Sequence, residues 1–422
     1  MTPARELWIL NHYAGAPDQP AATRHFELAR ALVGQGLRVT IFAAGLSHFT
    51  NAETRVRRGR LYERRAVDGV RFVWVRTVPY RGNTWMRLLN MLSYAVVVLV
   101  VQSRFRRPDA IIGSTVHPFA AAAALVAARI RGARFLFEIR DLWPQTLVDM
   151  GAMPSGSIAA RGLWWIEAVL VRRAEIVITL LPRMAEYLAQ RGLPTDRILY
   201  LPNGVRFRVD RPEAAPRHVA ETLDRLEAEG RFVIGYVGAH GRANGLQVIV
   251  DAAARLQSEG DGRIHVVLVG DGPEKPGLLA SARDLGLANV TFVDPVARGA
   301  VAAVLRRLDA AILHLSYVDV FRYGISPNKL FDYMANECPV LFACQSGNDP
   351  VTEAGAGISL PPEDPAALAA AMREMAGLPR RERRRMGAAG RRYIEQNHDL
   401  ERLAARLGDY LRTGRLVGSE AT

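Results

Sequence analysis

The feature that most constrains the fold of this chain is an alternation, repeated twice, of short β-branched runs with helix-length segments rich in Ala and Leu. Such alternation is typical of parallel sheets with helices on both faces. The first half predicts strands at residues 7–12, 38–43, 70–75, 110–113, 134–139 and 176–180. The second half predicts strands at residues 232–238, 264–270, 290–293, 310–315 and 340–343. The sequence therefore predicts an α/β protein with two doubly wound, Rossmann-like domains.

A charged, proline-bearing stretch at residues 206–213 separates the two halves and is typical of a linker. We therefore expect an N-terminal domain over residues 1–205 and a C-terminal domain over residues 206–390. No strand follows the last helical segment, so residues 391–422 are expected to hold one helix, from Arg391 to Arg412, that crosses back to the first domain. Residues 202–208 are the expected hinge.

Composition indicates an ordinary globular protein. The chain has 422 residues, of which 49% are hydrophobic and 23% charged, enough for two full cores. Its two cysteines, Cys338 and Cys344, provide no disulfide or metal framework, which favours a reducing compartment. The N-terminus lacks the basic and apolar regions of a signal peptide. A cytoplasmic location is expected.

The longest apolar run, at residues 91–101, is about half as long as a membrane-spanning helix requires. Trp85 and Arg87 precede it, and Arg104 and Arg106 follow it. An apolar segment with an interfacial Trp and flanking arginines can lie on an anionic bilayer. A buried helix with solvated arginines at its ends is the alternative, and the sequence leaves both open.

The formal charge of +13 indicates anionic partners without identifying them. Arginines concentrate at residues 55–65, 104–107 and 380–392. No zinc finger or ribonucleoprotein motif occurs, so nucleic acid is not an expected partner. Phosphates of a sugar donor, a diphosphate lipid and membrane headgroups would account for the charge, although a run such as residues 380–385 is also typical of a solvated helix face.

In open parallel sheets, ligands bind beyond the carboxyl ends of the strands. Residues 238–245 (GAHGRANG) follow a predicted strand and open a helix there. Glycines let backbone amides approach a phosphate, and an arginine can neutralise it. A tight strand-to-helix turn without a ligand is the alternative. The candidate donor-binding residues in this loop are Gly238, Gly241, Arg242 and Asn244.

Residues 324–334 (GISPNKLFDYM) are the most informative stretch. Ser326 is predicted to cap a helix whose first position is Pro327. Lys329 then lies in the first turn, where the helix dipole disfavours a cation unless an anion shares the site. A bound diphosphate meets that need, and Asp332, on the same face, can accept hydrogen bonds from a ribose. A surface ion pair between Lys329 and Asp332 is the alternative.

Two strand ends in the first half carry polar residues, His117 after the fourth predicted strand and Asp141 after the fifth. His117 is read equally as a structural and as a functional residue. The sequence Gly270-Asp271-Gly272-Pro273 is only a weak dinucleotide fingerprint, because the third glycine is missing at the required spacing. No Asp-x-Asp triplet, Gly-x-Ser-x-Gly elbow or Walker loop occurs, so neither a metal nor any other cofactor is expected, and hydrolases and kinases are disfavoured.

With these motifs the chain resembles family 4 of the retaining glycosyltransferases, which have the two-domain GT-B fold with a central cleft. It looks similar to the bacterial branch that includes N-acetylfucosamine transferases of surface polysaccharide synthesis. The resemblance covers nearly the whole chain. The motifs that carry it lie at residues 137–144 (FEIRDLWP), 201–205 (LPNGV), 238–246 (GAHGRANGL), 269–273 (VGDGP) and 324–334 (GISPNKLFDYM).

The resemblance implies that Gly15 approaches the donor phosphates and that Arg242 and Lys329 neutralise them. Asp332 matches the second acid of the family's paired-glutamate motif, while Gly324 stands where the first acid would be. His117 is implied beside the anomeric carbon and Asp141 on the acceptor side. The implied reaction is front-face transfer with retention, in which the departing phosphate takes the acceptor proton.

The family further implies a UDP-linked, N-acetylated sugar as donor and a polyprenyl-diphosphate-linked sugar as acceptor, used at the inner face of the plasma membrane. O-antigen or capsule assembly is the expected setting. Two rival readings remain: a nucleotide-sugar 2-epimerase of the same fold, and a non-catalytic scaffold that lacks the acid at Gly324. The retained Lys329 and Asp332 argue against the scaffold.

Overall fold

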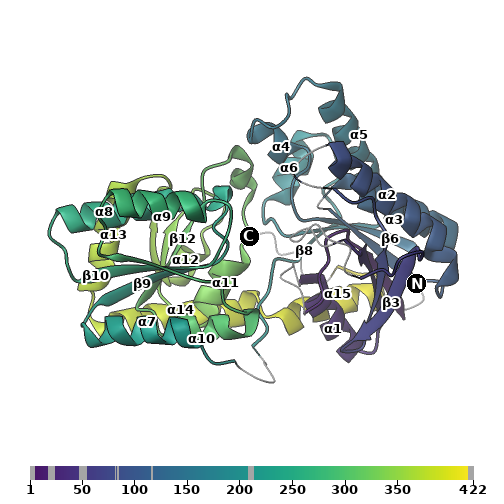
Figure 1. Ribbon diagram of the computed structural model, residues 1–422. Helices are drawn as coiled ribbons and strands as arrows, with labels where there is room; N and C mark the ends of the chain where they lie inside the picture. Colours follow the sequence, from purple (N-terminus) through teal and green to yellow (C-terminus); the bar gives the residue numbers. More distant parts are fainter. Residues whose placement is uncertain are drawn as a thin grey trace. The chain divides into compact units, whose positions relative to one another are not determined.

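The computed structural model describes residues 5–17, 24–46, 55–80, 82, 85–115, 117–207 and 213–416. The chain forms two compact units (Figure 1). The first unit comprises Met1–Asn203 together with Leu400–Thr422, and the second comprises Gly204–Asp399. Residues 208–212, which belong to the predicted linker and hinge, lie outside the described residues.

The first unit is built on an eight-stranded sheet in the order β3-β4-β2-β1-β5-β6-β7-β8, parallel except for β3. Its strands are β1 (Glu6–Leu10), β2 (Arg38–Ala44), β3 (Tyr62–Val67), β4 (Val70–Val75), β5 (Ala110–Ser114), β6 (Arg134–Ile139), β7 (Ile176–Thr179) and β8 (Ile198–Tyr200). Its helices are α1 (Arg24–Gly34), α2 (Trp85–Val101), the 3₁₀ turn η1 (Gln102–Arg104), α3 (Pro118–Arg131), α4 (Gln145–Asp149), α5 (Ile158–Arg173), α6 (Met184–Gln190) and α15 (Leu400–Thr413).

The second unit holds a six-stranded, fully parallel sheet in the order β11-β10-β9-β12-β13-β14. Its strands are β9 (Phe232–Val237), β10 (Ile264–Val269), β11 (Val290–Val293), β12 (Ala310–His314), β13 (Val340–Ala343) and β14 (Gly357–Leu360). Its helices are α7 (Arg217–Ala228), η2 (Arg242–Asn244), α8 (Gln247–Ser258), α9 (Lys275–Asp284), η3 (Arg298–Ala300), α10 (Val301–Leu305), η4 (Asp319–Tyr323), α11 (Asn328–Ala335), α12 (Pro350–Ala354), α13 (Pro365–Gly377) and α14 (Arg380–Asn397).

The sheet of the second unit buries an apolar layer on both faces, because its strands are almost continuously hydrophobic. One face packs against α7, α10, α11 and α14, and the other against α8, α9 and α13. Figure 1 shows these two sets of helices on opposite sides of the sheet. The predicted α/β class with doubly wound domains is confirmed.

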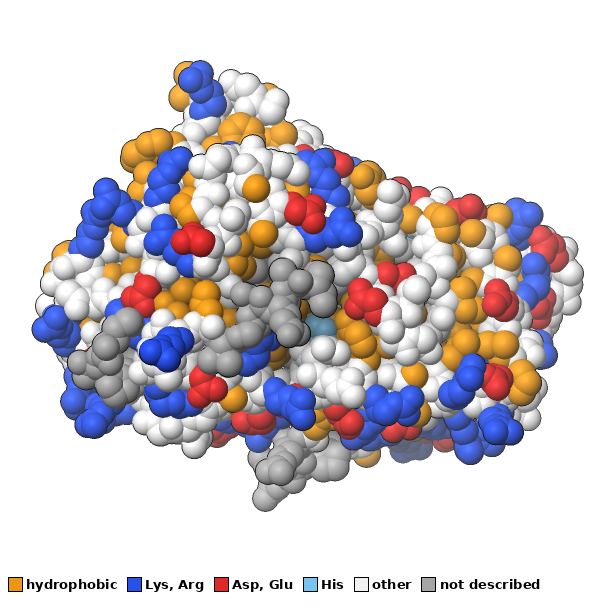
Figure 2. All heavy atoms as spheres, turned by 180° about the vertical axis from the view of Figure 1, so that it is seen from behind, with side chains coloured by type: hydrophobic (Ala, Val, Ile, Leu, Met, Phe, Trp, Pro, Cys, Tyr) orange, Lys and Arg blue, Asp and Glu red, His pale blue; other side chains and the backbone are white. Residues whose placement is uncertain are grey.

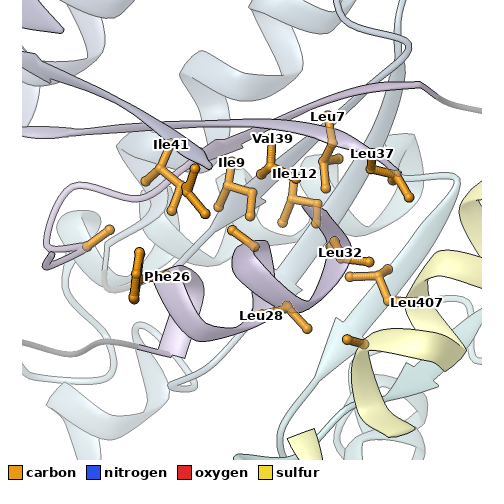
Figure 3. Close-up of a cluster of buried hydrophobic side chains, with 14 of the residues drawn as sticks. Leu7, Ile9, Phe26, Leu28, Leu32, Leu37, Val39, Ile41, Ile112 and Leu407 are labelled. Carbon is orange, nitrogen blue, oxygen red and sulfur yellow. The ribbon is translucent and has the colours of Figure 1, made fainter. Parts of the chain in front are cut away.

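The C-terminal helix closes the core of the first unit. Leu403, Leu407 and Leu411 of α15 are buried in one cluster with residues of α1 and of the sheet. Figure 3 shows Leu407 beside Leu32, which lies under the strand residues. The apolar face of α15 therefore supplies part of the first unit's core, although it comes from the end of the chain.

The expected single helix from Arg391 to Arg412 is wrong. The structure has two helices here, α14 ending at Asn397 and α15 beginning at Leu400. Between them His398 leaves the helical conformation and stacks on Phe331, with ring centroids 3.9 Å apart. α14 belongs to the second unit, so the boundary falls near residue 400 rather than at 391.

Helix α2 is longer than the apolar run that predicts it. The stretch Trp85–Arg104 is long and apolar enough to cross a membrane by length and composition, with a mean hydropathy of 1.5. In the structure it packs on the sheet: buried Asn90 donates to Thr77 Oγ1 and Val78 O, and the Tyr94 hydroxyl donates to Phe42 O. One face of α2 is therefore part of the first unit's core.

Candidate functional site

Each sheet has a topological switch point, where successive connections run to opposite faces. In the second unit it lies between β9 and β12, and in the first between β1 and β5. Ligand crevices of doubly wound sheets form at such points, beyond the carboxyl ends of the strands. Most of the predicted site residues follow these four strands.

The loop after β9 is held in shape by β12. His314 at the end of β12 shares a 2.8 Å hydrogen bond with Asn244 O, and Ser316 N donates to Ala243 O. Gly245 adopts a left-handed conformation with φ +52°, and a Cβ there would lie 2.6 Å from His314 Cε1. A glycine is therefore required for η2 to approach β12 this closely.

Lys329 is the centre of a hydrogen-bond network at this edge of the sheet. Its ammonium donates to the Tyr236 hydroxyl at 2.7 Å and to Asn244 Oδ1. Tyr236 and the Asn244 amide each donate in turn to Ala239 O. A Cβ on Gly238 would lie 2.5 Å from Lys329 Cδ, so the glycine makes room for the lysine side chain. The network fixes the ammonium at the end of β9.

The charge of Lys329 is poorly compensated. No carboxylate pairs with it among the described residues, and burial lowers its pKa to about 8. It lies in the first turn of α11, where the positive end of the helix dipole further disfavours the protonated form of the lysine. An ammonium has three N–H donors, and the network uses two of them. The site is arranged to accept an anion.

A second wall comes from the loop after β10. Gly270 and Gly272 have positive φ, and a Cβ on either would strike the backbone of Gly238 or His240. His240 is fully buried, and neither ring nitrogen has a hydrogen-bond partner among the described residues. Lys275, at the start of α9, donates to Gly270 O and to Asp294. The weak glycine fingerprint thus serves close loop packing.

The remaining predicted residues of the β9 loop fall as follows. Arg242 is exposed in η2 and has no ion-pair partner among the described residues. Gly241 precedes it, and a Cβ there would meet no atom closer than 3.7 Å. Arg242 is therefore free to move toward a ligand, whereas Gly241 is not required by packing.

The predicted N-cap of α11 is wrong. The helix begins at Asn328, with Pro327 in the capping position, and no side chain caps it. Ser326 precedes that position by one residue. The error is one residue in register, and Lys329 still lies in the first turn. The N-terminus of a helix is in general a favourable place for an anion.

Asp332 is buried and forms a bidentate ion pair with Arg298 of η3, at 2.5 and 2.9 Å. The alternative ion pair between Lys329 and Asp332 does not form. Sequence reasoning missed Arg298, because it lies on a 3₁₀ turn far from Asp332 in sequence. Only the structure brings them together.

Gly324 has φ 107° and ψ 170°, a conformation that is essentially restricted to glycine. An acid at this position would be strained. The departure from the family's paired acids therefore has a local physical cause in the backbone.

In the first unit, the switch point carries two histidines. His117 Nε2 and His12 Nδ1 share a hydrogen bond of 3.0 Å. His117 is fully buried, and its Nδ1 has no partner among the described residues. Burial, with a contribution from the Arg87 charge, lowers the pKa of His117 to about 3. The ring is therefore neutral at physiological pH.

Beneath these histidines lies a buried charged cluster. Tyr13 N donates to Asn11 Oδ1, which orients the Asn11 amide toward His25 Nδ1. His25 therefore carries its proton on Nε2 and donates it to Glu138 at 2.5 Å. Burial lowers the pKa of His25, so the ring is neutral and Glu138 is ionised. Arg24 compensates this carboxylate.

Arg24 also fixes the segment that follows β8. Its guanidinium donates to Leu201 O at 2.6 Å and to Pro202 O at 2.7 Å. Arg24 therefore holds the end of the first unit's main segment in place, just before the chain enters the second unit at Gly204.

Gly15 is buried in the loop after β1, and Asp141 is exposed after β6. Together with His117, these two residues belong to the first unit, and the other predicted site residues belong to the second. Across the residues that the structure describes, no group of three or more His, Cys, Asp or Glu is arranged to hold a metal ion.

One signal that sequence reasoning overlooked is the scarcity of lysine. Only Lys275 and Lys329 occur among the 55 basic residues of the chain. Both border the loops after β9 and β10. An ammonium is more compact than a guanidinium and titrates more readily when buried. A chain that otherwise uses arginine therefore has lysine where a small buried cation is required.

Comparison with known proteins agrees with this architecture. A model of the "Glycosyl transferase 4-like domain" family matches residues 21–204, and a model of "Glycosyl transferases group 1" matches residues 231–377. The protein named "Putative colanic acid biosynthesis glycosyl transferase WcaI" of Escherichia coli (strain K12) is 26% identical over 343 residues, covering 77% of this chain and 79% of that protein.

Two solved structures extend the agreement over the whole fold. Sucrose-phosphate synthase from Thermosynechococcus elongatus has a TM-score of 0.71 and 16% identity, and covers 97% of this chain and 98% of its own. Alr3699/HepE of Anabaena, solved in complex with UDP and glucose, has a TM-score of 0.68 and 15% identity, and covers 97% of this chain and 100% of its own.

The family models identify the chain as a glycosyltransferase, and the solved structures share its GT-B fold of two doubly wound units. The chain belongs to the family 4 glycosyltransferases, as its motifs predicted.

Proposed function

We propose that this glycosyltransferase moves a sugar from a UDP-sugar to a lipid-linked or saccharide acceptor in the assembly of a surface polysaccharide. The observation that carries the proposal is the half-buried ammonium of Lys329 at the start of α11, which no carboxylate compensates among the described residues. A nucleoside diphosphate supplies the missing negative charge. The similarity to Alr3699/HepE supports UDP as the carrier, and the similarity to WcaI supports polysaccharide assembly.

The proposed chemistry is transfer with retention. Lys329, Arg242 and the N-terminus of α11 stabilise the charge that develops on the departing diphosphate. A phosphate oxygen of the departing diphosphate takes the proton from the acceptor hydroxyl. In this reaction the protein needs neither a nucleophile of its own nor a metal. Neutral His117 is proposed beside the anomeric carbon, Asp141 on the acceptor side, and Gly15 near the donor phosphates.

A ligand screen tests the donor site. We expect UDP to raise the melting temperature more than GDP or ADP, with and without Mg²⁺. Lys329→Gln and Arg242→Gln should each reduce this stabilisation and the rate of transfer, whereas Arg380→Gln, at an exposed position of α14, should not. Unchanged UDP binding and turnover in both site variants would overturn the proposal.

Products distinguish the rival functions. Transfer from UDP-N-acetylhexosamines should release UDP and extend an acceptor, whereas a 2-epimerase would yield an epimeric UDP-sugar. UDP binding without turnover on any saccharide or polyprenyl-diphosphate-linked acceptor would identify a scaffold.

We also propose that the first unit binds the inner face of the plasma membrane through α2. The side chains on its outer face recur at helical spacing and are exposed, with Trp85 at 71%, Val96 at 59% and Val100 at 52%. We call this set the α2 stripe; its members are Trp85, Leu88, Leu89, Leu92, Val96 and Val100. A continuous exposed apolar stripe is typical of a helix that lies in a bilayer interface.

Vesicle sedimentation tests the α2 stripe. We expect the wild-type protein to sediment with lipid vesicles, and the variant Leu92→Ser with Val96→Ser to remain in the supernatant while its melting temperature is unchanged. Equal sedimentation of both proteins would contradict a role for α2.

A further inference from the structure

A cavity of about 430 Å³ lies in the first unit, on the face of the sheet that α2 covers. Glu6, at the start of β1, and Arg71, near the start of β4, line it. It therefore lies toward the amino ends of these strands, whereas the switch point and His117 lie at the carboxyl ends. None of the residues assigned to sugar transfer lines this cavity.

The rim of the cavity is cationic. Arg64 and Arg65 of β3 line it, together with Arg104 of η1 and Arg106. All four side chains are exposed, and none has a carboxylate partner among the described residues. We call Arg64, Arg65, Arg104 and Arg106 the rim arginines. Four guanidinium groups around one cavity favour a phosphate or carboxylate group.

The single acid in the wall does not compensate this charge. Glu6 is buried and already pairs with Arg71 and, at 3.0 Å, with Arg38. Two arginines thus share one carboxylate, and the local charge remains positive.

The floor of the cavity is aromatic. Trp8 and Phe105 line it and stand edge to face, with ring centroids 6.5 Å apart. Trp8 is fully buried, and its indole N–H has no acceptor among the described residues. The cavity thus combines an apolar floor with a cationic rim.

The α2 stripe leads to this cavity. Val100, the last member of the stripe, precedes Arg104 by one helical turn, and the Arg104 guanidinium donates to Val100 O. A molecule bound at the rim would therefore lie at the end of the apolar stripe. Anionic phospholipids have this chemistry, with a phosphate next to acyl chains.

We propose that the arginine-rimmed cavity binds the phosphate headgroup of an anionic phospholipid, while the α2 stripe contacts its acyl chains. The inference rests on the membrane contact proposed above and adds a specific headgroup site to it. The site makes membrane binding depend on lipid charge, because each arginine near an anionic surface adds to the attraction. Figure 2, which shows the molecule from behind relative to Figure 1, has Lys and Arg side chains spread over much of this face. A test of the cavity therefore needs a control variant that removes the same charge from another part of the surface.

Flotation with two kinds of vesicle tests the site: phosphatidylcholine alone, and phosphatidylcholine with phosphatidylglycerol. We expect wild-type protein to bind the anionic vesicles about tenfold or more tightly than the neutral ones. Arg64→Gln with Arg104→Gln and Arg106→Gln should remove this preference and retain the binding to neutral vesicles. The control, Arg380→Gln with Arg381→Gln and Arg384→Gln on exposed α14, removes the same charge and should keep the preference.

The outcomes separate the two proposals. If wild-type protein binds neither vesicle, the membrane contact of α2 is wrong. If the protein binds vesicles but the rim and control variants lose affinity equally, the headgroup site is wrong and only net charge matters. A last experiment compares inorganic phosphate and glycerol 1-phosphate with dihexanoyl phosphatidylglycerol as ligands of the wild-type protein. If either small phosphate stabilises the protein as strongly as the short-chain lipid does, the cavity binds a free phosphate and the proposal of a lipid headgroup site is wrong.

Discussion

At the scale of single residues, Lys329 shows how a fold can disfavour the charged form of a side chain until an anionic ligand binds. Its ammonium is buried and donates to Tyr236 and Asn244, neither of which carries a compensating charge. Burial lowers the pKa of the free site from 10.5 to about 8. A bound diphosphate favours the protonated form, so it raises this pKa again.

The affinity for UDP should therefore depend on pH. We expect it to fall as pH rises above about 8, because more of the free protein must then take up a proton to bind. Calorimetry at pH 8.5 in buffers of different ionisation enthalpy should show proton uptake by wild-type protein. Lys329→Gln should bind UDP about tenfold or more weakly and show no such uptake. Uptake that persists in the variant would assign the proton to another group.

Gly324 provides a second test at this scale. Restoring the family's acid through Gly324→Glu should destabilise the protein by about 1–3 kcal/mol, because φ 107° with ψ 170° strains any residue with a Cβ. Gly324→Ala should cost a similar amount, which separates backbone strain from the added charge. Urea unfolding of the variants measures both. A Glu variant as stable as wild type would show that the loop relaxes easily.

At the scale of elements, helix α1 packs into the core and also holds the segment after β8 in place. Phe26 and Leu28 of α1 lie below the strand residues in Figure 3. Arg24, at the start of the same helix, pairs with buried Glu138 and donates to the carbonyls after β8. One helix end thus joins β6 to the segment that leaves the first unit.

Arg24→Ala should destabilise the first unit by about 3–5 kcal/mol, because it leaves the Glu138 carboxylate buried beside a neutral His25. The sign of its pH dependence follows from Glu138. Although burial alone would raise the pKa of Glu138, its partners hold that pKa well below 4.5. The stabilisation that the ionised Glu138 contributes is complete above about pH 4.5. It is lost as the pH falls from there through the lowered pKa of the folded protein. Acid unfolding should therefore separate wild type from variant less than neutral unfolding does.

Most central strands could be predicted from sequence, because buried parallel strands are continuous apolar runs. β4, β6 and β13 match their predicted bounds, and so does the edge strand β11. β3 was missed: its sequence YERRAV lies within an arginine cluster, and as an exposed antiparallel edge strand it needs no apolar pattern. β14 was missed because it begins at a glycine, Gly357, where a Cβ would strike Val340.

The candidate site was predictable where one short segment contains it. Lys329 follows from its place near the start of α11, and the β9 loop from its glycines. Arg298 could not be assigned, because it reaches Asp332 from another loop. Lys275 could have been singled out only by the scarcity of lysine in the chain. The arginine-rimmed cavity combines β1, β3, β4 and the end of α2, so no local pattern reveals it.

At the scale of the whole molecule, the second unit is continuous in sequence and the first is not. We expect a fragment of residues 204–399 to fold alone and to bind UDP, since Lys329, Asn244 and Tyr236 all lie within it. Two-dimensional NMR spectra and UDP titration check this. A fragment that folds without binding UDP would show that the donor site also needs the first unit.

The reciprocal truncation, which removes residues 400–422, should unfold the first unit. It exposes apolar surface that Leu403, Leu407 and Leu411 cover, at about 1.5–3 kcal/mol for each buried leucine. Calorimetry should then retain one transition, that of the second unit. Retention of two transitions would show that α15 is dispensable.

The return of α15 to the first unit also affects synthesis of the protein. The second unit is complete once Asp399 has left the ribosome, whereas the first unit still lacks the leucines of α15 at that moment. The part of the chain made first therefore finishes folding last, once α15 has also been synthesised. Until then its sheet carries an uncovered apolar strip, so the nascent N-terminal half is the segment that most needs protection by chaperones.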